Sequence, residues 1–343
     1  MDTPSGTTSA RVTDLVIRHR IFQTFGWTTI IVGLVLAIGP AMAQDEAAPE
    51  ASVMARLASR TLTLDAFAVD GAYVAVGERG HILISTDGGE TWQQQQVPTR
   101  TALTGVYFHD RNLGWAVGHD SAILRTADGG VTWELINWAP DDEAPFFDVW
   151  FSDADNGVVI GAYGGYWETT DGGATWSTRW ISEDDWHLHK IARSEKGRLY
   201  IAGEAGSVYR SDDNGENWVT LPTLYQGSYF GVLPLEGDSV LIFGLRGHLF
   251  RSDDAGETWE ELVTGTVSML TDGQRLADGT IVITGLGGAI LTSSDGGLTF
   301  TLHQQANRSG ISAAVETGDG SLLLVGQFGV KTAALSELTA GSN

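Results

Sequence analysis

The segment Ser85–Trp92, "STDGGETW", contains two acidic residues, two glycines and a tryptophan, and close copies of it recur along the chain. The copies follow the pattern Ser/Thr-x-Asp-x-Gly-x-x-aromatic, and their aspartates are 41, 43, 42, 41 and 41 residues apart. A catalytic site is built once, whereas a motif repeated at a fixed period is typical of a device that every structural repeat needs. The six motifs contain the pairs Asp87 and Trp92, Asp128 and Trp133, Asp171 and Trp176, Asp213 and Trp218, Asp254 and Trp259, and Asp295 and Phe300.

A second motif has the same period and occurs seven times. Its first copy is "GERGHIL" at Gly77–Leu83, and each copy lies between two short apolar, β-branched or aromatic runs. Glycine-bounded turns between such runs predict β-hairpins. One repeat then contains four strands, and four strands in about 40–45 residues are typical of a propeller blade. The sequence predicts an all-β, seven-bladed β-propeller with Asp-box repeats of about 41–43 residues.

The last repeat contains three predicted strands and no Asp box. We expect an N-terminal strand within residues 51–61 to close the ring, although "VMARLAS" in this stretch also has a helix-like pattern. The predicted organisation is a signal peptide at 1–43, a flexible acidic leader at 44–51, the propeller at 52–335 and a flexible tail at 336–343.

The N-terminal residues carry the features of an export signal. Arg18 and Arg20 precede the apolar run Trp27–Gly39, and the small residues Ala41–Ala43 follow it. This order predicts a secretory signal peptide cleaved before Gln44, with an uncleaved membrane anchor as the alternative. The chain has no Cys, which argues against a lipid anchor. We expect the periplasm, or the thylakoid lumen in a photosynthetic source.

The chain is strongly acidic. Its formal net charge is −23, and loss of residues 1–43 would remove three Arg and two Asp and change the charge to −24. A field of this sign opposes binding to nucleic acid or to an anionic membrane surface. Without Cys there are no disulfides, so stability must come from the core and from ring closure. We expect a monomer.

The chemistry of the Asp box suits a turn between the third and fourth strands of a blade. An aspartate side chain accepts backbone N–H bonds within a turn, glycine adopts positive φ, and a Ser or Thr hydroxyl extends the network. The aromatic residue at the end of the box enters the outer strand and buries a large apolar area. The sequence therefore predicts that all six boxes are structural.

The Asp box resembles that of BNR-repeat propellers, which include sialidases. The longer stretch "YFHDRNLGWAVGHDSAILRTADGGVTW" at Tyr107–Trp133 resembles the photosystem II stability/assembly factor family of seven-bladed propellers, and the resemblance extends over about Leu62–Ala333. It implies a non-enzymatic assembly factor that binds a membrane protein or membrane complex and needs no cofactor. Because fold-level likeness does not establish function, this remains an expectation.

A binding surface is expected where the seven Gly-bounded turns and the loops between blades lie together. The turns keep their glycines while the residues between them vary, and the neighbouring loops are rich in Trp and Tyr. Aromatic residues and Arg are enriched at the centres of protein interfaces. The candidate partner-binding residues are Arg79, His119, Tyr163, Trp180, Trp186, Tyr225, Tyr229 and Arg246.

The alternative function is a glycan-acting BNR-repeat hydrolase. Sialidase-like chemistry would use Tyr163 as nucleophile with Arg residues of the same face, and a general glycosidase would draw its carboxylate pair from Asp120, Asp148 and Glu204. Nothing in the sequence selects such a pair, and seven repeats differ from the six blades of sialidases. His187 and His189 share a strand face but lack a third ligand, so no metal site is predicted.

Overall fold

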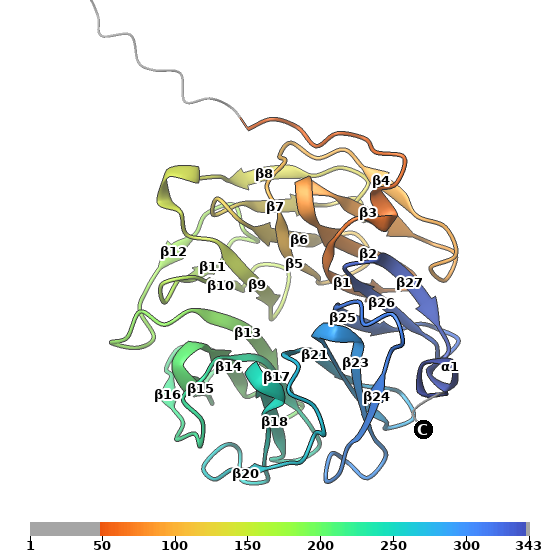
Figure 1. Ribbon diagram of the computed structural model, residues 1–343. Coiled ribbons are helices and arrows are strands. Elements are labelled where there is room, and N and C mark those ends of the chain that lie inside the picture. Colours follow the sequence, from red (N-terminus) through yellow and green to blue (C-terminus); the bar gives the residue numbers. More distant parts are fainter. Residues whose placement is uncertain (1–48, 341–343) are drawn as a thin grey trace, which may run out of the picture. The chain divides into compact units, whose positions relative to one another are not determined.

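The structure of the protein is a computed structural model that describes residues 49–340, and its strands form seven antiparallel sheets arranged in a ring (Figure 1). Each sheet is one blade, and the blades are numbered 1 to 7 along the chain. The predicted all-β, seven-bladed β-propeller is confirmed. Residues 1–43, the predicted signal peptide, lie outside the described residues.

Six blades have four strands each and the seventh has three. Blades 1 to 3 contain β1 (Thr63–Val69), β2 (Ala72–Gly77), β3 (Ile82–Ser85) and β4 (Gln93–Gln95); β5 (Leu103–Phe108), β6 (Gly114–Gly118), β7 (Ile123–Thr126) and β8 (Glu134–Asn137); and β9 (Phe146–Phe151), β10 (Gly157–Gly161), β11 (Tyr166–Thr169) and β12 (Ser177–Thr178). Blades 4 and 5 contain β13 (Leu188–Arg193), β14 (Leu199–Gly203), β15 (Val208–Ser211) and β16 (Val219–Thr220); and β17 (Tyr229–Pro234), β18 (Val240–Gly244), β19 (Leu249–Ser252) and β20 (Glu260–Glu261). Blades 6 and 7 contain β21 (Leu270–Arg275), β22 (Ile281–Gly285), β23 (Ala289–Ser293) and β24 (Thr301–Gln304); and β25 (Ile311–Glu316), β26 (Leu322–Gly326) and β27 (Gly329–Ala333), followed by helix α1 (Leu335–Thr339).

The core lies between neighbouring blades. The first strand of every blade contacts the first strand of the next, and β1 contacts β25, so these seven strands surround the central channel. The second strands are almost wholly buried and consist mainly of Val, Ile, Leu, Ala and Gly, because both of their faces pack against adjacent blades. Seven apolar clusters fill the seven interfaces; one of them joins Val74 of blade 1 to Phe108 of blade 2.

Each Asp box is a hydrogen-bonded turn whose buried centre is a hydroxyl. In blade 3, the Thr169 hydroxyl accepts the Gly173 N–H at 2.9 Å and donates to the Asp171 carboxylate at 2.8 Å. Asp171 also accepts the backbone N–H and the hydroxyl of Thr175. These bonds, those from Thr175 first, lower the pKa of Asp171 to about 2. Thr169 is buried, whereas Asp171 is exposed. Loss of the Thr169 hydroxyl therefore leaves the buried Gly173 N–H without an acceptor.

The last glycine of each box packs against the preceding blade. A Cβ at Gly173 would lie 2.8 Å from Trp115 Nε1 of blade 2, and the same indole donates to the Gly172 carbonyl. The position before it is less restricted, because Asn214 and Ala255 occupy it in blades 4 and 5 with positive φ. The box therefore joins neighbouring blades as well as closing a turn, which explains why its last glycine never varies within the chain.

Replacing Thr169 by Val tests the role of the hydroxyl. Valine has nearly the same shape but leaves the buried Gly173 N–H without an acceptor, which costs about 1–3 kcal/mol. We expect urea denaturation to show a loss of this size in the free energy of unfolding. The matched change at the neighbouring exposed residue, Thr170→Val, should have little effect. Equal stability of the two variants would contradict the account.

The predicted N-terminal closing strand does not form. Residues 49–57 contain no strand; Ser52 instead exchanges hydrogen bonds with Val97, and Gln94 binds the backbone at Val53 and Ala55, all on blade 1. A short 3₁₀ helix at Ala58–Arg60 then packs beside β27. Blades 1 and 7 close the ring by direct packing of their own strands.

Two observations support this closure. One apolar cluster contains Tyr73 and Ala75 of blade 1 together with Leu323 and Val325 of blade 7. In addition, the Gly318 N–H donates to the Tyr73 hydroxyl at 3.0 Å, joining residues 245 apart in sequence.

The predicted flexible tail is wrong for residues 336–340. Helix α1 follows blade 7, and its Leu338 is 4% exposed in a cluster with Leu276 and Ile290 of blade 6. Blade 7 has no Asp box, so it brings no box aromatic to its interface with blade 6. Leu338 fills part of that interface.

Candidate functional site

One repeated hydrogen bond places the Gly-bounded turns beside the loops between blades. The residue after the first glycine donates its N–H to the carbonyl just before the first strand of the same blade, as Ala162 does to Pro145 and Leu245 to Ser228. The Asp boxes lie at the other ends of the strands, where the Gly172 N–H binds the Asp155 carbonyl. The loop face, defined as the Gly-bounded turns and the inter-blade loops, is therefore opposite the boxes.

Six of the seven turns share one backbone geometry. Their third residue is left-handed, with φ between 55° and 65°: Arg79, Asp120, Tyr163, Ala205, Arg246 and Gly287. A left-handed conformation costs an L-residue about 1–2 kcal/mol, so sequence alone would favour glycine there. In blade 7 the turn is one residue shorter, because Gly326 pairs with Gly329. His119 is exposed but precedes the left-handed position, which Asp120 occupies.

An aromatic cluster lies on the loop face of blades 3 to 5. Tyr163 is 55% exposed, and its ring meets the His187 ring edge-on with 5.1 Å between the ring centroids. The ring centroid of Phe147 lies 5.9 Å from that of His187 and 5.6 Å from that of His189. The His189 ring stacks on Phe230 with 4.6 Å between the centroids. Tyr163 was predicted from the sequence as a binding residue, whereas Phe147 and Phe230 were not. Phe147 and Phe230 share one feature that could have indicated them: each is the second residue of the first strand of its blade.

Two tryptophans border this cluster. The Trp180 ring lies over Gly164, where an added Cβ would approach it to 2.8 Å, and Trp180 is still 66% exposed. Trp186 is 38% exposed, and its carbonyl accepts the Gly164 N–H at 3.1 Å. The backbone bond fixes the loop, while both indoles remain open to solvent. Gly164 thus anchors two exposed aromatic residues beside Tyr163.

The loop face continues as an apolar surface over blades 4 to 6. Leu224, Val263, Val267 and Leu286 are between 38% and 87% exposed, and all four lie in inter-blade loops or Gly-bounded turns. A solvent-exposed apolar patch of this kind marks an interaction surface more often than a structural one. Exposed Arg246 lies within the same region.

One predicted binding residue is excluded. The Tyr229 side chain is fully buried at the interface of blades 4 and 5, where it meets Phe250 edge-on. Tyr225 is half-buried and packs on the His248 ring at 4.1 Å, so only part of it faces solvent. Aromatic composition could not separate these roles, because Tyr229 begins β17 and points between blades.

Two acidic loops flank the Tyr163 turn. Residues Asp141–Glu143 are exposed and lead into Pro145, whose carbonyl binds the Ala162 N–H. Residues Glu183–Asp185 are also exposed and lie next to Gly164. The aromatic cluster therefore has carboxylates on two sides, an arrangement that favours cationic side chains because Lys and Arg pair with carboxylates and stack on aromatic faces.

The central channel contains a charge cluster that sequence analysis did not identify. Lys190 Nζ lies 3.5 Å from an Asp148 carboxylate oxygen, and Asp65 and Asp272 also act on its charge. Burial disfavours the Lys190 cation, but these three carboxylates outweigh it and raise its pKa. Burial, only partly offset by Lys190, raises the pKa of Asp272 to about 6.

Each of these carboxylates binds the next blade. Asp148 accepts the Ile191 N–H, and Asp65 accepts that of Val106, in both cases on the channel-facing edge of the neighbouring first strand. The edge amides would otherwise be unpaired, which explains why acidic side chains occupy these positions. Asp148 is thus occupied structurally, and its pairing with Lys190 leaves it unsuited to the glycosidase role considered above.

The histidine pair also has a structural environment. His189 Nδ1 lies 2.9 Å from the Tyr229 carbonyl, and burial lowers its pKa. His187 Nδ1 lies 3.8 Å from Glu204 Oε2. Within residues 49–340 no group of three His, Cys, Asp or Glu side chains is arranged to hold a metal ion. No helix in the same range has the length and apolar character needed to cross a membrane.

Comparison with known proteins identifies the family. The family model described as photosynthesis system II assembly factor YCF48 matches residues 84–146 and 140–329. The chain belongs to this family. A search of curated proteins returned no match.

Solved structures share the fold at low sequence identity. A structure titled "YCF48 bound to D1 peptide" is 20% identical with a TM-score of 0.66, covering 83% of this chain and 94% of that one. YCF48 from Cyanidioschyzon merolae is 16% identical with a TM-score of 0.64, covering 83% and 98%. An ancestral GH74 enzyme has a TM-score of 0.66 but is 12% identical, covering 80% and 45%, so it shows the fold alone.

Proposed function

We propose that this YCF48-family chain is a non-enzymatic, exported assembly factor that docks a protein partner on its loop face. The observation that carries the proposal is the concentration of exposed Tyr163, Trp180 and Trp186, with Leu224 and Val263, on one face of blades 3 to 6. A relative in the same family is described as bound to a D1 peptide, which agrees with peptide binding by this fold. We further propose that the partner is a membrane protein.

The charge of the face sets the chemistry of the partner. The acidic loops beside Tyr163 favour a segment that combines apolar side chains with Lys or Arg, because cations pair with the carboxylates and stack on the exposed rings. Such a partner also gains from the net charge of −23 during diffusional encounter. Copurification of one partner without hydrolysis of a panel of glycosides supports the proposal. Hydrolysis that is lost in Asp120→Asn would contradict it.

Export makes a separate prediction. The apolar run Trp27–Gly39, followed by Ala41–Ala43, suits cleavage before Gln44. We expect N-terminal sequencing of the protein purified from its own source to begin at Gln44. An N-terminus at Met1 in the cell-envelope fraction would instead favour the uncleaved anchor.

A further inference from the structure

Blade 7 departs from the other six blades at its outer edge. Its sheet ends at β27, and within the described part of the chain no backbone hydrogen bond reaches the outer edge of β27 from Val330 to Thr332. In every other blade the third strand pairs with a fourth. The residues that would supply this strand, Val53–Ala55, bind blade 1 instead.

The interface of blades 6 and 7 differs from the other interfaces in two side chains. In the other interfaces a box aromatic packs into the cluster, as Trp133 does between blades 1 and 2, whereas blade 7 has no box and Leu338 of α1 packs into the cluster instead. The third strand also differs. The residue facing the interface is apolar in blades 1 to 6 and is Lys331 in blade 7; the six apolar residues are Leu83, Leu124, Trp167, Tyr209, Phe250 and Leu291.

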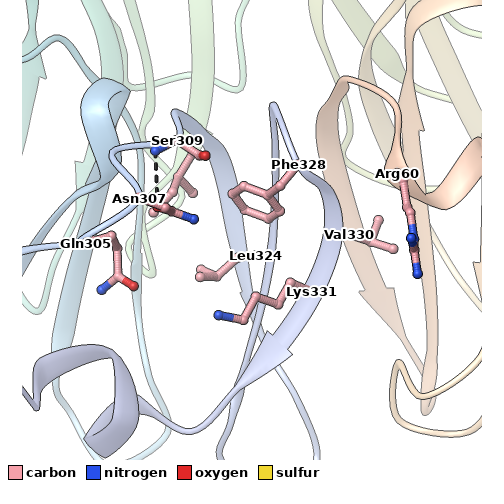
Figure 2. Close-up of a pocket in the computed structure, with 9 residues that line it drawn as sticks. Arg60, Gln305, Asn307, Ser309, Leu324, Phe328, Val330 and Lys331 are labelled. Atoms are coloured by element: carbon pink, nitrogen blue, oxygen red, sulfur yellow. Dashed lines mark hydrogen bonds between the residues drawn. The ribbon is translucent and has the colours of Figure 1, made fainter.

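A hollow of about 280 Å³ lies beside β27, at the end of this interface that Asn307, Ser309 and Phe328 line on the loop face. Figure 2 shows Leu324 and Phe328 on its apolar wall, Lys331 extending along it from β27, and Gln305 on the opposite side. Arg60 lies at its edge. Neither Lys331 nor Arg60 forms an ion pair with another described residue, although the chain has a net charge of −23.

We propose that this edge binds an extended segment of a partner protein as the fourth strand of blade 7. The open backbone of β27 supplies main-chain hydrogen bonds, and the hollow accepts an apolar side chain of the segment. An acidic residue of the segment lies across from Lys331. The site is separate from the loop-face cluster on blades 3 to 5 and does not depend on the function proposed for it.

The chain itself supplies a suitable probe. Residues 260–264, "EELVT", begin with the fourth strand of blade 5, where Glu261 pairs with Phe250. Phe250 corresponds to Lys331 in the strand register. A peptide of this sequence bound to blade 7 in the same register therefore places its second strand glutamate across from Lys331.

The test measures fluorescence anisotropy of this labelled peptide against the full chain at physiological salt. We expect saturable binding that Lys331→Glu weakens at least tenfold, because two like charges then face each other. A second peptide, in which lysine replaces Glu261, should have a higher affinity for the Lys331→Glu variant than for the wild-type protein. Lys331 is exposed, so this variant should keep the wild-type melting temperature.

Two controls distinguish peptide binding at β27 from binding at the loop face and from coverage of this edge by the chain itself or by a second copy. Arg246→Glu alters the loop face and should leave peptide affinity unchanged. Hydrogen exchange should show protection of the Val330 and Thr332 amides, which alternate with the β26-facing Lys331 amide, only when peptide is added. Protection in the protein alone, whether constant or rising with protein concentration, would show that the chain or a second copy covers the edge and would overturn the proposal. Equal peptide binding by the wild type and Lys331→Glu would also overturn it.

Discussion

Replacing Lys190 by Met should lower the free energy of unfolding by about 3 kcal/mol at neutral pH. This is the largest stability loss that we expect from a single substitution. The change removes the cation that lies among Asp65, Asp148 and Asp272 and leaves their carboxylates facing one another in the channel. Removing one partner of a buried ion pair costs about 3–5 kcal/mol. Urea denaturation measures the loss, and Lys190→Arg, which keeps the charge, is the matched control.

The pH dependence of this loss has a definite sign. Asp272 has a folded-state pKa of about 6, above its ordinary value, so the folded protein holds that proton more tightly than the unfolded chain. Protonation therefore stabilises the fold as pH falls through 6, and it also removes one of the unpaired charges in Lys190→Met. The difference between wild type and Lys190→Met should shrink between pH 8 and pH 5. A difference that is constant with pH, or absent at neutral pH, would contradict this account of the channel.

Removing both exposed tryptophans of the loop face should weaken partner binding by a factor of thirty or more. Trp180 and Trp186 border the aromatic cluster, and truncation of a tryptophan at an interface centre costs about 2–4 kcal/mol. Because both indoles are exposed, Trp180→Ala/Trp186→Ala should keep the fold and its melting temperature. Quantitative affinity capture measures the loss. Val131→Ala, an exposed apolar residue of an Asp box, is the control, and equal losses from both faces would contradict a specific loop-face site.

The fold was predictable because each repeat carries its own turn chemistry. Asp171 and Gly173 specify a turn wherever they occur at this spacing, and a period of 41–43 residues leaves room for four strands. The ring ends were not predictable in the same way. Val53–Ala55 bind Gln94 through side-chain contacts distant in sequence, and no local pattern separates that from strand pairing with β27.

The candidate site was only partly predictable. Exposed Tyr163 and Trp180 were selected by composition, whereas Tyr229 was selected by the same criterion and is buried. Burial depends on which strand face a residue occupies, and the bulge at the start of each first strand shifts that register. The channel cluster was missed because Asp148 and Lys190 meet only when the blades converge, although both are the third residue of a first strand.

Site-specific photo-crosslinking tests the central claim most directly. A photoreactive amino acid is placed at Trp186 on the loop face or at Val131 on the Asp-box face, both exposed, and each protein is irradiated with membranes of its own source. We predict one dominant covalent adduct to a protein from position 186, lost when unlabelled wild-type protein competes, and none from position 131. The same adducts from both positions, or no competed adduct from position 186, would contradict protein docking on the loop face.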